Sequence, residues 1–170
     1  CVIGSGGREH ALARRLYDSP SVTAVYAVPG SAAMAEVATC ENLDWADTPA
    51  LLSFLKANGV DLVVIGPEAP LVAGLGDTLR DAGYAVFGPS KAAARLEGSK
   101  VFAKEIMKKY NIPTAAYGVF SDVAEAKKFI AEVGAPIVIK ADGLAAGKGV
   151  VVAMTLDEAN AAVDDMLAGN

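Results

Sequence analysis

Short apolar segments alternate with segments of helical periodicity along the first half of the chain. The apolar segments have the length of single buried strands, and they occupy residues 1–4, 23–28, 61–66 and 84–88. The segments between them repeat their apolar positions with the period of a helix, over residues 7–19, 48–59 and 69–83. Strands that are nearly continuous in Val and Ile, separated by helices, are typical of a parallel sheet covered on both faces.

The pattern changes after residues 88–89, where a Gly-Pro pair interrupts the alternation. The second half predicts a helix, an extended strand, a helix, a strand–loop–strand unit and a final helix, over residues 99–111, 112–120, 121–134, 135–154 and 155–169. We therefore place a domain boundary near residues 89–98. The predicted fold is α/β: a Rossmann-like parallel-sheet domain over residues 1–98, followed by an incomplete α+β domain over residues 99–170.

Capping residues mark the predicted helix starts. Thr48 precedes Pro49, a residue that suits the first helical position, and Ser99 precedes the basic helix of the second half. Asp122 and Thr155 are each followed three residues later by Glu, which is the pattern of a capping box.

Composition and charge exclude several classes of protein. The chain has 170 residues, 53% of them hydrophobic and 21% charged, which is typical of a globular protein. No apolar run approaches the length of a membrane span. The formal net charge is −5 and there is no block of Lys or Arg, so neither nucleic acid nor a membrane is expected as a partner. Positive charge must therefore be local, so a lysine that the fold holds at a fixed position is a candidate for binding a negatively charged ligand.

Metal and disulfide chemistry are not indicated. Cys1 and Cys40 lack metal-ligand spacing and are expected to be small buried hydrophobes, while His10 is the only histidine. No signal peptide is visible, so we expect a cytoplasmic protein. Because the sequence begins inside an apolar run without Met and stops without a closing strand, we expect it to be a piece of a longer chain.

The first glycine-rich turn follows the first predicted strand. Gly4, Gly6 and Gly7 would allow close approach of an anion to a helix N-terminus. The next predicted strand ends without the acidic residue that a dinucleotide site needs, which favours a mononucleotide or a sugar phosphate over a nicotinamide cofactor. A tight turn without a ligand remains the alternative.

A second candidate site follows the third predicted strand. Gly66 and Pro67 shape a turn that presents Glu68 at the carboxyl end of that strand, where open α/β sheets bind ligands. The carboxylate would accept from a ribose hydroxyl or hold an amine. Alternatively, it is an idle carboxylate favoured by a helix N-terminus.

The loop over residues 142–149 differs from a P-loop. Only three residues separate Gly143 from Gly147, no Ser or Thr follows Lys148, and a strand follows the loop. The pattern therefore predicts a hairpin with a glycine-rich tip that closes over a polyphosphate. Lys140 lies in an otherwise apolar strand, where an ammonium is costly unless it is paired, and a phosphate would pair it. The alternative is a flexible hairpin with solvated lysines.

Five segments resemble a known family, the phosphoribosylamine–glycine ligases, also called glycinamide ribonucleotide synthetases. They are GSGGREHALA, GPEAPLVAG, FGPSKAAARLEGSK, IPTA and GAPIVIKADGLAAGKGVVVAMTLDEA, and they span the chain in order. The resemblance implies an ATP-grasp enzyme of purine biosynthesis, with ATP as cofactor and glycine and 5-phosphoribosylamine as substrates. ATP would phosphorylate the glycine carboxylate, and the amine would attack the acyl phosphate.

The resemblance also implies roles for individual residues. Lys140 and Lys148 would act in catalysis, with Lys104 competing with Lys100 as the first nucleotide-binding lysine. The residues expected to bind the nucleotide are Lys100, Lys140, Asp142, Gly143, Gly147, Lys148 and Gly149. Those expected to line the 5-phosphoribosylamine side are Gly4, Ser5, Gly6, Gly7, Arg8, Gly66, Pro67 and Glu68.

Family enzymes are much longer than this chain. The ligands for Mg²⁺ or Mn²⁺ and the glycine-binding region are expected beyond residue 170, in a missing C-terminal part. The fragment alone is therefore expected to be inactive. Two other functions stay open: another ATP-grasp carboxylate ligase or carboxylase, such as a relative of biotin carboxylase, and a non-catalytic nucleotide- or phosphate-binding module.

Overall fold

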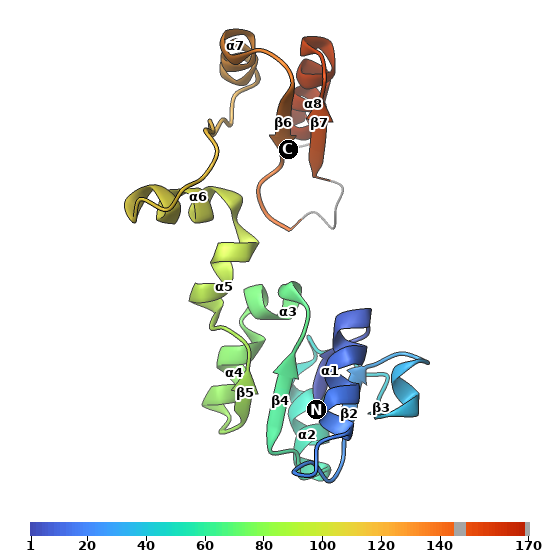
Figure 1. The fold of residues 1–170 in the computed structure, drawn as a ribbon. Helices are drawn as coiled ribbons and strands as arrows, with labels where there is room; N and C mark the ends of the chain where they lie inside the picture. Colours follow the sequence, from blue (N-terminus) through green and yellow to red (C-terminus); the bar gives the residue numbers. More distant parts are fainter. Residues whose placement is uncertain (145–148, 169–170) are drawn as a thin grey trace. The chain divides into compact units, whose positions relative to one another are not determined.

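The chain folds as two units, Cys1–Arg95 and Leu96–Asn170, in a computed structural model that describes residues 1–144 and 149–168 (Figure 1). The first unit has an α/β fold built on a parallel sheet, as the alternating pattern predicts. Within the described ranges, no helix combines the length and the apolar character needed to span a bilayer.

The sheet of the first unit has five parallel strands in the order β3-β2-β1-β4-β5. The strands are β1 (Val2–Gly4), β2 (Tyr26–Pro29), β3 (Thr39–Cys40), β4 (Leu62–Ile65) and β5 (Ala85–Phe87). After β1 the chain adds β2 and then β3 on one side of it. It then crosses back to add β4 and β5 on the other side of β1. The carboxyl ends of β1 and β4 therefore form the switch point at which open α/β sheets bind ligands.

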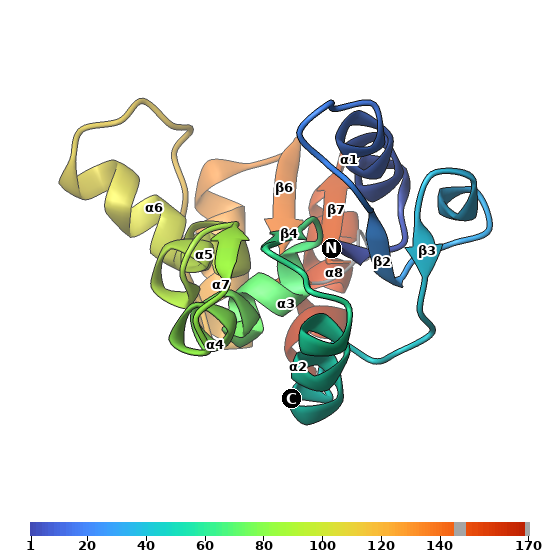
Figure 2. The same cartoon turned by 90° about the horizontal axis from the view of Figure 1, so that it is seen from below.

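Helices cover both faces of this sheet. They are α1 (Gly7–Tyr17), α2 (Thr48–Ala57), α3 (Glu68–Ala73) and α4 (Leu75–Asp81), with a short 3₁₀ helix at Met34–Glu36. A further helix, α5 (Lys91–Gly98), follows β5, and its residues are not among those of the core clusters of the sheet. Successive residues of β1 point to opposite faces: Val2 packs in the cluster that contains Ala13 of α1, and Ile3 packs in the cluster that contains Leu51 of α2. Figure 2 shows α1 and α2 on opposite sides of the strands.

Two local predictions for the first unit are wrong. The helix expected over residues 69–83 is interrupted at Gly74, whose φ of +102° ends α3 before α4 begins. The N-cap of α2 is Asp47 instead of Thr48, because the Asp47 carboxylate accepts the Ala50 N–H at 3.1 Å. The sequence reading also missed β3 and α5.

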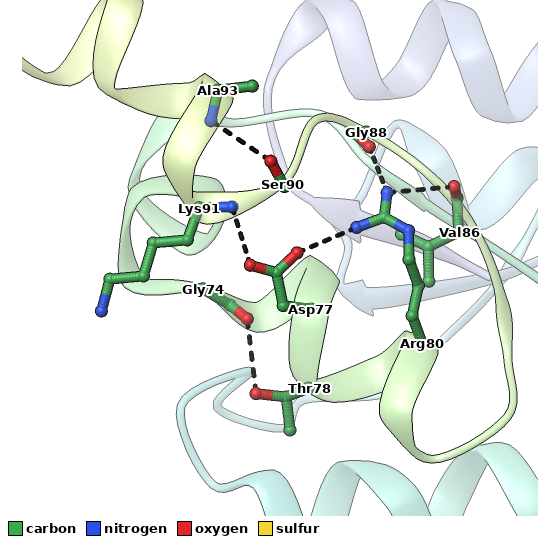
Figure 3. Close-up of polar contacts among 9 residues, drawn as sticks. All are labelled: Gly74, Asp77, Thr78, Arg80, Val86, Gly88, Ser90, Lys91 and Ala93. Carbon is green, nitrogen blue, oxygen red and sulfur yellow. Dashed lines mark hydrogen bonds and ion pairs between the residues drawn. The ribbon is translucent and has the colours of Figure 1, made fainter.

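Two side chains of α4 form hydrogen bonds with the segment that leads from β5 into α5 (Figure 3). Asp77 accepts the backbone N–H of Lys91 at 2.9 Å and pairs with Arg80 at 3.2 Å. Arg80 in turn donates to the carbonyls of Val86 and Gly88. The end of β5 and the first turn of α5 are thus held to α4 by one carboxylate and one guanidinium.

The second unit contains a two-stranded antiparallel hairpin, β6 (Ile137–Lys140) and β7 (Val150–Ala153), as predicted. Its helices are α6 (Lys100–Lys109), α7 (Val123–Val133) and α8 (Leu156–Ala168). Ile137, Ile139 and Ala153 face the core formed with α7 and α8. The opposite face of the hairpin is exposed, and it carries Val138, Lys140, Val150 and Val152.

The predicted caps of this unit are confirmed, but one predicted strand is wrong. Ser99 caps α6, Asp122 caps α7, and Glu158 accepts the backbone N–H groups of Met154 and Thr155. Residues 112–120 contain no strand, and most of them are exposed. The described sheet of this unit consists of β6 and β7, and residues 112–120 do not pair with the outer edge of either strand.

Candidate functional site

The two glycine-containing turns of the first unit lie side by side at the switch point of the sheet. Val2 pairs with Val64, and the Gly66 N–H donates to the Ile3 carbonyl at 3.1 Å. The turn after β1 therefore adjoins the turn after β4. The residues predicted to line the phosphoribosylamine side come from these two turns: Gly4, Ser5, Gly6, Gly7, Arg8, Gly66, Pro67 and Glu68.

Arg8 and Glu68 connect the two turns through a forked ion pair. The Arg8 Nη1 lies 3.0 Å from Glu68 Oε1, and Nη2 lies 3.2 Å from Oε2. The hydrogen bond from Arg8 lowers the pKa of Glu68 below its ordinary value. The side chains are 67% and 37% exposed, so the pair adds little to stability. Its main consequence is that an ionised carboxylate is held at the carboxyl end of β4.

Glu9 is a member of this cluster that sequence reasoning missed. Its side chain is 5% exposed, and its Oε2 accepts the Gly6 N–H at 2.8 Å. Oε1 is buried and has no hydrogen-bond partner, although Arg8 Nε lies 3.9 Å from it. The available signal was the spacing: Glu9 stands three residues after the helix N-cap, which is the acidic position of a capping box.

The predicted nucleotide residues surround a pocket of about 430 Å³ within the second unit. Three lysines line it: Lys100 and Lys104 from α6, and Lys140 from the end of β6. Gly143 and Gly149, which flank the tip of the hairpin loop, line it as well. Of the other residues expected to bind the nucleotide, Asp142 is not among those that line the pocket, and Gly147 and Lys148 lie outside the described residues.

Lys100 and Lys104 have different surroundings. The Lys100 ammonium donates to the Gly143 carbonyl at 2.7 Å, at the base of the hairpin loop. The Lys104 ammonium donates to Thr114 Oγ1 at 2.7 Å and to the Ala115 carbonyl at 3.0 Å, and it lies 5.0 Å from the ring centroid of Tyr117. Lys104 therefore holds the segment after α6, and the geometry favours Lys100 as the lysine that works with the loop.

Asp142 joins the end of β6 to the start of α6. Its carboxylate accepts Ser99 Oγ–H at 3.0 Å and the backbone N–H groups of Lys100 and Val101 at 2.7 and 3.2 Å. Partial burial raises the pKa of Asp142, but hydrogen bonds from Val101, Ser99, Gly143 and Lys100 together lower it below its ordinary value. The carboxylate thus fixes the spacing between the strand that carries Lys140 and the helix that carries Lys100.

A metal site is not complete in the described part of the chain. No group of three or more His, Cys, Asp or Glu side chains there is arranged to hold a metal ion. The carboxylates of the two sites are already engaged, Glu68 by Arg8 and Asp142 by the start of α6. The described residues therefore do not fit a magnesium centre.

Comparison with protein families gives two adjoining matches. Residues 1–97 match the family described as "Phosphoribosylglycinamide synthetase, N domain". Residues 98–170 match "Phosphoribosylglycinamide synthetase, ATP-grasp (A) domain".

Curated relatives carry the name phosphoribosylamine–glycine ligase. The protein from Mesorhizobium japonicum is 57% identical over 169 residues, and that from Escherichia coli K12 is 56% identical over 171 residues. Each match covers 99% of this chain but 40% of the relative. The chain thus spans about two fifths of the length of these relatives.

Solved structures show the same fold. Phosphoribosylamine–glycine ligase from Thermotoga maritima superposes with a TM-score of 0.71 at 36% identity, covering 94% of this chain and 37% of that protein. Biotin carboxylase from Campylobacter jejuni gives a TM-score of 0.72 at 18% identity, covering 99% of this chain and 42% of that protein. The second likeness supports the fold alone.

Proposed function

The chain belongs to the phosphoribosylglycinamide synthetase family, and on that basis we propose that it is part of an enzyme that joins glycine to 5-phosphoribosylamine. The reaction consumes ATP and yields glycinamide ribonucleotide, ADP and phosphate. This chain would supply the phosphoribosylamine side of the site and half of the nucleotide site.

The chemistry explains why lysines are needed. A glycine carboxylate is a poor electrophile, so its oxygen first attacks the γ-phosphorus of ATP, which releases ADP and forms an acyl phosphate. The amine of 5-phosphoribosylamine then attacks the acyl carbon, an amide bond forms, and phosphate leaves with the C–O electron pair. The protein contributes positioning and charge stabilisation to such phosphoryl transfers.

The observation that carries the proposal is the shared pocket of Lys100 and Lys140. Lys140 is placed by β6, on the same exposed face as the apolar side chains of Val138 and Val152. Two ammonium groups beside a glycine-rich loop suit the negative charge of a triphosphate. We assign Asp142, Gly143, Gly147, Lys148 and Gly149 to the same site, with Lys148 as a second catalytic lysine.

In the first unit, the turns that contain Gly4–Arg8 and Gly66–Glu68 would bind 5-phosphoribosylamine. Arg8 holds the Glu68 carboxylate in place and lowers its pKa, and this carboxylate would accept hydrogen bonds from ribose hydroxyls or from the amine. The divalent metal and the glycine would be held by the remaining part of the longer protein. The enzyme that contains this chain would act in the cytoplasm.

The test uses the longer enzyme that contains this chain. Lys140→Met should raise the KM for ATP or abolish glycine-dependent ADP release, since losing a charge-assisted phosphate contact costs roughly 1.5–3 kcal/mol. Lys56→Met, in the last turn of α2, is the matched control, and it should leave the ATP dependence unchanged. An unaltered ATP dependence in Lys140→Met would refute the assignment. Replacing glycine by bicarbonate or other acids in the same assay distinguishes the other ATP-grasp ligases and carboxylases.

A further inference from the structure

Glu9 is the buried charged residue among the residues that the structure describes, and none of the roles above uses it. It lies in the first turn of α1, beneath the glycine turn after β1 and against the turn after β4. Its residue exposure is 4%, whereas the neighbouring Arg8 and Glu68 reach solvent.

Three glycines close around this side chain. A Cβ on Gly4 would lie 2.5 Å from Glu9 Cγ, one on Gly6 would lie 2.8 Å from Oε2, and one on Gly66 would lie 2.3 Å from Oε1. All three distances are shorter than real Cβ contacts, so the carboxylate fits only because these positions lack side chains. Both turns of the proposed substrate site are therefore shaped around Glu9.

The carboxylate also occupies the anion position of the glycine turn. Its Oε2 accepts the Gly6 N–H at 2.8 Å, and this N–H is one that a substrate phosphate would otherwise use. The sequence reading expected an anion from the ligand here, but the protein supplies its own.

A capping role alone does not account for a charged side chain. A neutral amide of the same shape could accept the same N–H, and burying it would cost less than burying a carboxylate whose Oε1 has no hydrogen-bond partner. The negative charge faces Arg8, whose Nε lies 3.9 Å from Oε1 and whose fork binds Glu68.

We propose that Glu9 is a positioning residue for 5-phosphoribosylamine. Its buried negative charge keeps the Arg8 guanidinium in the position from which it binds Glu68. The same carboxylate excludes the substrate phosphate from the glycine turn, and Glu9 itself does not contact the substrate. This inference rests on the proposed function.

The test is a comparison of three KM values in the longer enzyme, with 5-phosphoribosylamine formed in situ from ribose 5-phosphate and ammonia. Glu9→Gln should raise the KM for 5-phosphoribosylamine about 10-fold to 100-fold, since misplaced groups at a site have effects of that size. The KM values for ATP and glycine should stay unchanged. Glu158→Gln is the matched control, because Glu158 makes the same kind of capping contact at α8, and it should change no KM.

A second variant tests whether the position of the charge matters. Glu9→Asp keeps the charge but withdraws the carboxylate from Gly6 and Arg8, so it should raise the same KM selectively. The proposal is overturned if Glu9→Gln changes no KM, shifts all three alike, or fails to fold while Glu9→Asp behaves as wild type. An inactive wild-type enzyme would instead refute the proposed function, so the two failures are distinguishable.

Discussion

At the scale of single residues, the fork between Arg8 and Glu68 lowers the pKa of Glu68 and holds its carboxylate in place. Because the pKa of Glu68 is lowered, the contribution of its carboxylate to stability is present above its ordinary pKa of 4.5 and is lost as the pH falls through the lowered value. An NMR titration of the Glu68 carboxyl should show that Arg8→Gln raises its pKa. Arg14→Gln is the control: it removes the partner of Asp18 and should leave the pKa of Glu68 unchanged. If Arg8→Gln also left the pKa of Glu68 unchanged, the account would be contradicted.

The contact between Gly66 and Glu9 gives a stability prediction. Gly66→Ala should lower the free energy of unfolding by about 1–3 kcal/mol, the usual cost of overpacking, because the new Cβ collides with a buried carboxylate. Gly7→Ala is the control: a Cβ there meets nothing within 4 Å, so it should be neutral or slightly stabilising. Denaturant unfolding of both variants measures the difference. Equal stability of Gly66→Ala and wild type would mean that Glu9 is not packed as described.

The candidate residues were easier to predict than their contacts. Lys140 could be selected from the sequence because a lysine that ends an apolar strand just before a glycine-rich loop suggests a polyanion, whereas Lys100 could be selected only from the resemblance to the family. The packing of Glu9 against Gly66 and the bonds of Asp142 could not be predicted, because they depend on how segments far apart in the sequence meet in three dimensions. Gly147 and Lys148 remain predictions, since they lie outside the described residues.

At the scale of elements, Asp142 is the link between β6 and α6. Asp142→Asn should weaken protection of the Lys100 and Val101 amides from hydrogen exchange and raise the KM for ATP in the longer enzyme, because the two lysine-bearing elements lose their common anchor. The local cost should be about 1 kcal/mol, the usual net contribution of one hydrogen bond, because the amide has one acceptor oxygen where the carboxylate has two.

Asp122→Asn is the matched control for this prediction. Asp122 caps α7 through the Glu125 N–H at 2.9 Å, away from the residues that line the lysine pocket. Because Asn caps a helix about as well as Asp, Asp122→Asn should cost little stability and leave the KM for ATP unchanged. If Asp142→Asn behaved in the same way, Asp142 would be a helix cap and nothing more.

Most elements could be predicted from periodicity, and the errors have local causes. The parallel sheet, the hairpin and the caps at Ser99 and Asp122 follow from patterns within a few residues. The break at Gly74 depends on a left-handed backbone conformation, and a single glycine in the sequence does not show that it will adopt this conformation. The segment over residues 112–120 has the composition of a strand, but composition does not determine whether a segment pairs with a sheet edge, and this segment pairs with neither β6 nor β7.

At the scale of the whole molecule, the chain spans 40% of its relatives, and its described residues complete no metal site. We expect the 170-residue chain alone to show no glycine-dependent ADP release, because the glycine and metal ligands would be supplied by the rest of the protein. A coupled assay for ADP with and without glycine measures this. Turnover by the isolated chain would contradict the proposed division of the site.

The central claim is that Lys100 and Lys140 bind the phosphates of one ATP molecule. The most direct measurement is a crystal structure of the longer enzyme with a non-hydrolysable ATP analogue. We predict the Nζ atoms of both lysines within hydrogen-bond distance of the phosphate oxygens, with Lys104 still bound to Thr114. Phosphates bound away from either lysine, or a Lys100 ammonium still bound to Gly143 beside an occupied nucleotide site, would contradict the account.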